Sequence, residues 1–144
     1  MSVSTMQYHY QTVGRILAYL INHGLARHDF DASDVMTIMT ERRGDDSEVT
    51  TTFFNCLFWM RNEGLIHVEN VDTYQDGRPP LFGNVQLASK GIAVIKANTN
   101  DADIGPSIEK KVTDAKGGDL GSDRYGKIGS FVGGMLGGFT QSFG

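Results

Sequence analysis

Apolar residues near the start of the chain recur at helical spacing. Their positions follow i, i+3, i+4, i+7 and i+8, which places these side chains on one helix face: Val13, Ile16, Leu17, Leu20 and Ile21. Such a stripe predicts an amphipathic helix that packs one face against a core. Gly24 follows shortly afterwards and can end the helix, because glycine readily closes helix C-termini.

A shorter stripe predicts a second helix. It covers residues 35–39, about two turns, and stops near Gly44. Asp31 and Ser33 precede it, and either side chain can accept a hydrogen bond from the first free backbone N–H groups. The sequence therefore predicts two helices joined by a polar turn.

The third predicted helix has two different faces. It begins near Asp45, whose spacing from Glu48 is that of a capping box, and it ends near Glu63 before Gly64. One face is apolar and is expected to point to the core: Val49, Phe53, Cys56, Leu57 and Met60. The opposite face contains Thr50, Thr51, Phe54, Asn55, Phe58, Arg61 and Asn62.

The next segment predicts two strands and a last helix. Residues 65–69 form the first strand, a turn-rich loop includes residues 76–80, and residues 85–87 form the returning strand. Two strands joined by a long loop make a β-wing. Ser89 can cap the helix that follows, whose apolar residues are Ile92, Val94 and Ile95.

This order of elements resembles the winged helix-turn-helix superfamily. Residues 59–66 (WMRNEGLI) and 87–91 (LASKG) resemble it in detail. The resemblance covers about two thirds of the chain and identifies no particular family. It implies an α+β winged-helix domain over residues 1–97, with a three-helix core, a β-wing and a following helix, and the typical role of such domains is DNA binding.

The remaining chain divides into two segments. Residues 98–125 are polar and rich in turn-forming residues, so we expect a flexible linker. Residues 126–144 form a glycine-rich tail whose large apolar residues share one helical face: Ile128, Phe131, Val132, Met135, Leu136 and Phe139. Gly129, Gly133 and Gly137 form a GxxxGxxxG pattern that resembles a glycine zipper, in which small residues let helix backbones pack closely.

The tail is expected to become ordered only when it docks. Each interior glycine costs about 1 kcal/mol of helix propensity relative to alanine, so an isolated helix would not be stable in water. Three docking sites are open: a groove on the same domain such as the face with Phe54 and Phe58, the equivalent site on a partner subunit, or a membrane surface. Docking within or between subunits is favoured, because the apolar run is too short to cross a bilayer.

Charge and cysteine content narrow the function classes. The formal net charge is −4, so any DNA site must be a local group of cations. The single cysteine, Cys56, lies in an apolar run and fits a reducing compartment. No signal peptide pattern or long apolar stretch is evident, and we expect a cytoplasmic protein.

Candidate DNA contacts gather around the third helix and the wing. The polar and basic residues that could reach phosphates or base edges are Arg42, Arg43, Thr51, Asn55, Arg61 and Arg78. Two features oppose this interpretation. Asp45, Asp46 and Glu48 lie at the start of the helix, and Phe54 and Phe58 lie on the face that would enter the groove, so both are candidates for a protein interface.

No pattern in the sequence indicates an enzyme. Residues 121–127 have the spacing of a phosphate-binding loop, but Ile128 replaces the hydroxyl residue that would bind magnesium. His23 and His28 lie near Asp29 and Asp31 without the ligand spacing of a closed metal site. We expect no catalytic residue, cofactor or metal.

Three hypotheses follow. The first is a dimeric winged-helix regulator that binds DNA through the third helix and the wing. The second is a protein-interaction or oligomerisation module of the same fold that uses Phe54, Phe58 and the tail. The third is a membrane-associating effector that acts through the tail.

Overall fold

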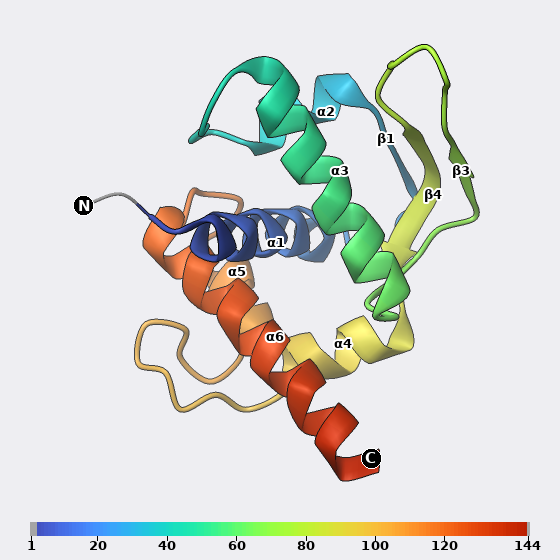
Figure 1. Cartoon of the computed structure of the whole chain (residues 1–144). Coiled ribbons are helices and arrows are strands. Elements are labelled where there is room, and N and C mark those ends of the chain that lie inside the picture. The colour runs from blue at the N-terminus through green and yellow to red at the C-terminus, as the bar shows by residue number, and fades with distance from the viewer. Residues whose placement is uncertain (1–2, 144) are drawn as a thin grey trace.

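The computed structural model describes residues 3–143 and the side chains of residues 3–137. Within that part of the chain it has six helices and a small antiparallel sheet, so the predicted mixed α+β class is confirmed (Figure 1). In chain order the elements are α1 (Thr5–Asn22), β1 (His28–Phe30), α2 (Ala32–Ile38), α3 (Asp46–Asn62), β2 (Ile66–His67), β3 (Asn70–Asp72), β4 (Leu81–Leu87), α4 (Ser89–Lys96), α5 (Ile108–Asp114) and α6 (Ser122–Phe143).

Helix α1 lies at the centre of the molecule and contacts both α3 and α6 (Figure 1). It begins with a capping box in which Ser4 and Gln7 exchange two hydrogen bonds between side chain and backbone. Every residue from 12 to 18 is buried, which is about two full turns. The sequence predicted one buried face, whereas the structure covers this part of α1 all round.

Aspartates begin α2 and α3 as the sequence predicted. Asp31 Oδ1 accepts a hydrogen bond from the Ser33 backbone N–H at 2.9 Å, so Asp31 is the N-cap and Ser33 is not. Asp45 Oδ1 accepts from the Glu48 backbone N–H at 2.9 Å. These caps satisfy N–H groups that have no partner within the helix, and they set where each helix starts.

Strand β4 is the centre of the sheet. It pairs antiparallel with β1 along one side and with β2 and β3 along the other, so β4 lies between β1 and β2. The sequence predicted the two sides of the hairpin but missed β1, which pairs His28 with Val85. A three-residue strand leaves too little alternation to be recognised without its partner.

Residues 98–125 differ from the predicted flexible linker. They contain α5, which Ser107 caps by accepting from the Lys110 backbone N–H at 3.1 Å. Ile104, Ile108 and Val112 are buried, and α5 contacts α1 and α4. Three aliphatic residues at a spacing of four in a polar background were too few to indicate a helix. In the structure Ile108 and Val112 are the buried residues of α5, which packs against two other helices, and Ile104 is buried in the turn that precedes α5.

The glycine-rich tail forms α6 and packs along α1 of the same chain (Figure 1). Ile128, Val132 and Leu136 are buried there, while Phe131 and Met135 are half-buried. The side chain of Phe139 lies outside the described residues. Of the three docking sites considered, the structure has the tail on its own domain, but on α1 and not on the face with Phe54 and Phe58.

Two glycines bring the backbones of α1 and α6 into contact. A Cβ at Gly129 would lie 2.0 Å from the Tyr10 carbonyl oxygen, and one at Gly14 would lie 2.1 Å from the Tyr125 carbonyl oxygen. A Cβ at Gly133 would lie 3.2 Å from the Tyr10 ring, whereas a Cβ at Gly137 would meet nothing within 4 Å. Gly129 is therefore the member of the predicted GxxxGxxxG pattern that the close approach requires.

Candidate nucleic-acid interface

Helix α3 presents a polar face to solvent. Thr51, Asn55 and Arg61 are exposed on it. The residues expected on the core side are buried: Val49, Phe53, Cys56, Leu57 and Met60. Hydroxyl, amide and guanidinium groups on an exposed helix face are the groups that contact DNA phosphates and base edges.

Phe54 and Phe58 do not form an exposed apolar patch. Phe54 is buried in the core, and its ring lies 5.8 Å from that of Phe82 on β4. Phe58 is half-buried, with its ring 4.8 Å from the same Phe82 ring. The sheet covers this flank of α3, and a helical pattern cannot show that a sheet from later residues will pack on a second side.

Arg42 and Arg43 lie in the loop before α3 and are exposed. Arg42 donates to the carbonyl oxygens of Met36 and Met39, each at 3.1 Å, and so satisfies the C-terminal end of α2. Arg43 donates to the Val3 carbonyl oxygen at 3.2 Å, and its guanidinium lies over the Tyr8 ring, 5.9 Å from the centroid. Both charges are held close to the surface by contacts with their own chain.

Arg78 lies in the loop between β3 and β4. Its Nε donates to Asp76 Oδ2 at 2.8 Å, and its guanidinium lies 4.2 Å from the centroid of the Tyr74 ring. Hydrogen bonds from Arg78 hold the pKa of the Asp76 carboxyl below its usual range. Because the side chains of both residues are more than half exposed, at 65% and 57%, this ion pair adds little to stability.

The structure does not bring the four predicted arginines into one cluster. Arg42 and Arg43 precede the first turn of α3, whereas Arg61 lies in its last turn, about 25 Å away at 1.5 Å per residue. Asp46 and Glu48 occupy the first turn, where negative charge complements the helix dipole and opposes phosphate. Any DNA contact would therefore be distributed along α3 and the hairpin loop.

A groove of about 320 Å³ runs beside the polar face of α3. We call it the α1–α3 groove, and it is lined by Met6, His9, Tyr10, Val13, Asn55, Cys56, Trp59 and Gly133. Met6 is 57% exposed, so part of the apolar lining faces water. The thiol of Cys56 donates to the His9 carbonyl oxygen at 3.7 Å, and burial raises its pKa to about 12, so it is a structural group and not a nucleophile.

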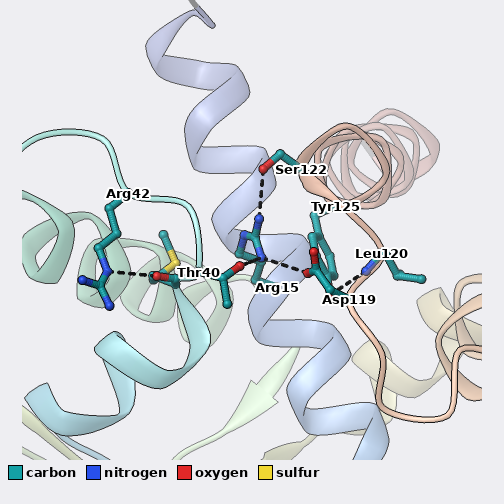
Figure 2. A network of polar contacts seen from close by, with 8 residues as sticks. Arg15, Thr40, Arg42, Asp119, Leu120, Ser122 and Tyr125 are labelled. Atoms are coloured by element: carbon teal, nitrogen blue, oxygen red, sulfur yellow. Dashed lines mark hydrogen bonds and ion pairs between the residues drawn. The ribbon is translucent and has the colours of Figure 1, made fainter.

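A buried arginine was missed by the sequence analysis. Arg15 is only 4% exposed, and it joins α1 to two distant segments (Figure 2). Its guanidinium donates to the Thr40 hydroxyl at 2.7 Å and to the Ser122 hydroxyl at 2.9 Å, and it lies 3.4 Å from Asp119 Oδ1. The signal in the sequence is a charged residue between Val13 and Ile16, within a stripe that must be buried.

The remaining chemical candidates are not brought together. Gly121 precedes α6 and follows a loop, so residues 121–127 lack the strand that introduces a phosphate-binding loop. In the part of the chain that the structure describes, no three His, Cys, Asp or Glu side chains are grouped as metal ligands. Over the same residues, no helix has the length and apolar character to cross a bilayer.

Comparison with protein-family models, curated proteins and solved structures found no match to this chain.

Proposed function

We propose that this protein is a winged-helix regulator that binds DNA through α3 and the loop between β3 and β4. The order of elements supports the winged-helix assignment: three helices, a strand, a loop and a returning strand, with β1 closing the far side of β4. The hairpin lies beside α3, where a wing would lie (Figure 1). In this architecture the third helix enters the major groove while the flanking elements contact the backbone.

The observation that carries the proposal is the exposed polar face of α3. Thr51 and Asn55 lie one turn apart at its centre, where they could reach base edges. Among the residues that the structure describes, the Arg61 side chain has no hydrogen bond or ion pair, so its guanidinium needs no internal contact to be broken before it binds phosphate. The net charge of −4 predicts weak, salt-sensitive binding to nonspecific DNA, since the rest of the surface gives no attraction.

The test is fluorescence anisotropy of the full chain with a labelled mixed-sequence duplex across a range of salt concentrations. Arg61→Ala is expected to weaken binding and to lower the salt slope by about 1, because one phosphate contact is lost. Arg124→Ala is the matched control, since Arg124 is also exposed but lies on α6. Equal affinities for Arg61→Ala and wild type, or equal losses in both variants, would contradict the proposal.

The α1–α3 groove supports a second candidate function, a protein-interaction module. Met6, Tyr10 and Trp59 place apolar surface beside the polar face of α3, and such surfaces are common at protein interfaces. The partner proposed for this case is a second copy of the chain, in line with the dimers typical of helix-turn-helix proteins. Phe54 takes no part in it, because it is buried. A membrane role for the tail would require α6 to leave α1.

Sedimentation velocity of the full chain tests this second candidate. Met6→Glu is expected to shift a dimer toward monomer, because it places a charge in the apolar groove. Leu25→Glu is the control, since Leu25 is similarly exposed, at 60%, but follows α1 at its other end. A monomeric wild type, or dissociation by both variants alike, would reject the groove as a dimer interface.

A further inference from the structure

Arg15 borders a cavity that the proposed DNA-binding role does not use. The cavity has a volume of about 200 Å³ and lies between α1, α2 and the loop before α6. Its lining includes Tyr19, Thr37, Thr40, Gly118 and Asp119, together with Arg15 itself. A volume of this size would hold about six or seven waters at roughly 30 Å³ each, which is the space of a small metabolite.

The guanidinium of Arg15 is buried but only weakly neutralised. Its two shortest hydrogen bonds go to the hydroxyls of Thr40 and Ser122, which carry no charge. Its one carboxylate contact in the part of the chain that the structure describes is Asp119, at 3.4 Å, and the Asp119 side chain is 58% exposed. Charge-assisted hydrogen bonds are about 2.7–2.9 Å long, so this contact is long for an ion pair.

The surroundings leave the edge of the guanidinium available for hydrogen bonding. Tyr125 covers one face of the planar group, with 4.5 Å between its ring centroid and Arg15 Cζ (Figure 2). Because the N–H donors of a guanidinium lie in its plane, hydrogen-bond partners approach at its edge. A guanidinium has five N–H donors, and the contacts just described involve two of its three nitrogens. An in-plane oxyanion is the ligand whose geometry matches paired guanidinium donors.

We propose that this cavity binds a small oxyanion, a carboxylate or a phosphate, which replaces Asp119 as the partner of Arg15. The hydroxyls of Thr40 and Ser122 lie beside the guanidinium and could donate to the same anion. The Asp119 side chain can turn toward solvent when an anion takes its place, because it is 58% exposed. The ligand would then lie where α1, α2 and the start of α6 meet.

Asp119→Asn separates this proposal from a permanent internal ion pair. The substitution keeps the size of the side chain and a carbonyl acceptor, but it removes the charge that an incoming anion must displace. We expect it to tighten anion binding by about tenfold, which corresponds to about 1.4 kcal/mol. Asp114→Asn is the matched control, because Asp114 is an exposed carboxylate on α5 that pairs with Lys110.

The experiment is a titration of the full chain, wild type and both variants, followed by amide chemical shifts at constant ionic strength. Inorganic phosphate and malonate are the two probes, and the one that binds more tightly identifies the phosphate or the carboxylate as the ligand group. Shifts at Gly117, Gly118 and Ser122 that saturate at lower concentration in Asp119→Asn than in Asp114→Asn support the site. No saturable shifts in any variant, or equal affinities in the two variants, overturn it.

Arg15→Lys adds an independent arm. Lysine keeps the charge but cannot donate in a paired planar geometry, so the affinity for either probe should fall. Unchanged affinity would overturn the assignment of Arg15 as the binding group. If this variant fails to fold, the comparison of the two aspartate variants still decides the outcome, because both of those residues are exposed. None of these readouts depends on DNA binding.

Discussion

Helices α3 and α6 both pack against α1, and both contain apolar residues that were predicted as interface candidates. Both helices pack their apolar residues against other elements of the chain, but they differ in which residues they expose to solvent. On α6 the apolar stripe packs against α1, and the exposed residues between 122 and 137 are charged near the start of the helix (Asp123, Arg124 and Lys127) and small further along (Ser130, Gly134 and Gly137). On α3 the apolar flank is covered by the sheet, and a polar face remains.

The comparison shows that an apolar stripe indicates burial without naming the element that covers it. Burying apolar area is favourable whatever the partner, so the hydrophobic effect alone does not separate a core from an interface. The polar face of α3 is more informative for function, because those side chains have no core to fill. The predictions below test this distinction, beginning with the largest expected effect.

Phe54→Ala is expected to destabilise the protein by about 3–5 kcal/mol, because it removes a buried ring and leaves a cavity beside Phe82. The measurement is urea denaturation of the full chain. Asn55→Ala is the control on the neighbouring exposed position, with an expected change within about 0.5 kcal/mol. A Phe54→Ala variant with wild-type stability but altered oligomeric state would mean that Phe54 belongs to an interface.

Gly129→Ala is expected to destabilise by about 1–3 kcal/mol, because the added Cβ would meet the Tyr10 carbonyl oxygen and force the two helices apart. Gly137→Ala belongs to the same glycine pattern but has open space around the new Cβ. It should stabilise by up to about 1 kcal/mol through helix propensity. Thermal unfolding of both variants measures the difference, and equal effects would show that α6 does not pack on α1 at Gly129.

A smaller change in the free energy of unfolding is expected from Cys56, which lies on the side of α3 that faces α1. Burial raises its pKa to about 12 from the ordinary thiol value of 9.0. Above pH 9 the unfolded chain therefore loses the thiol proton while the folded chain keeps it, and stability falls as pH rises from 9 to 12. The loss from this group is about 1.4 kcal/mol at pH 10.

Urea denaturation at pH 8 and pH 10 checks this expectation. Cys56→Ala should show a smaller loss between the two pH values than wild type, since the titrating thiol is absent. An equal loss in both proteins would show that the thiol is not buried. The difference between the two proteins isolates Cys56 from tyrosines and lysines that also titrate at high pH.

The sequence by itself determined the mixed α+β class, the start of α2 and α3, and the buried side of α3. Those features depend on spacing and capping within a few residues, and Asp31 and Asp45 show that local hydrogen bonds suffice to place a helix start. The sequence also identified Gly129 as a close-packing glycine, but could not separate it from Gly137. That distinction depends on which part of α6 crosses α1.

Tertiary structure decided the rest, because it brings together residues that are far apart in the chain. The sheet that buries Phe54 comes from residues that follow α3, and the segment expected to be a linker became ordered once α1 and α4 offered a surface for Ile108 and Val112. The cavity at Arg15 depends on Thr40, Asp119 and Ser122, which lie 25, 104 and 107 residues away along the chain. No local sequence pattern predicts this set of contacts, since it is complete only when α6 packs against α1.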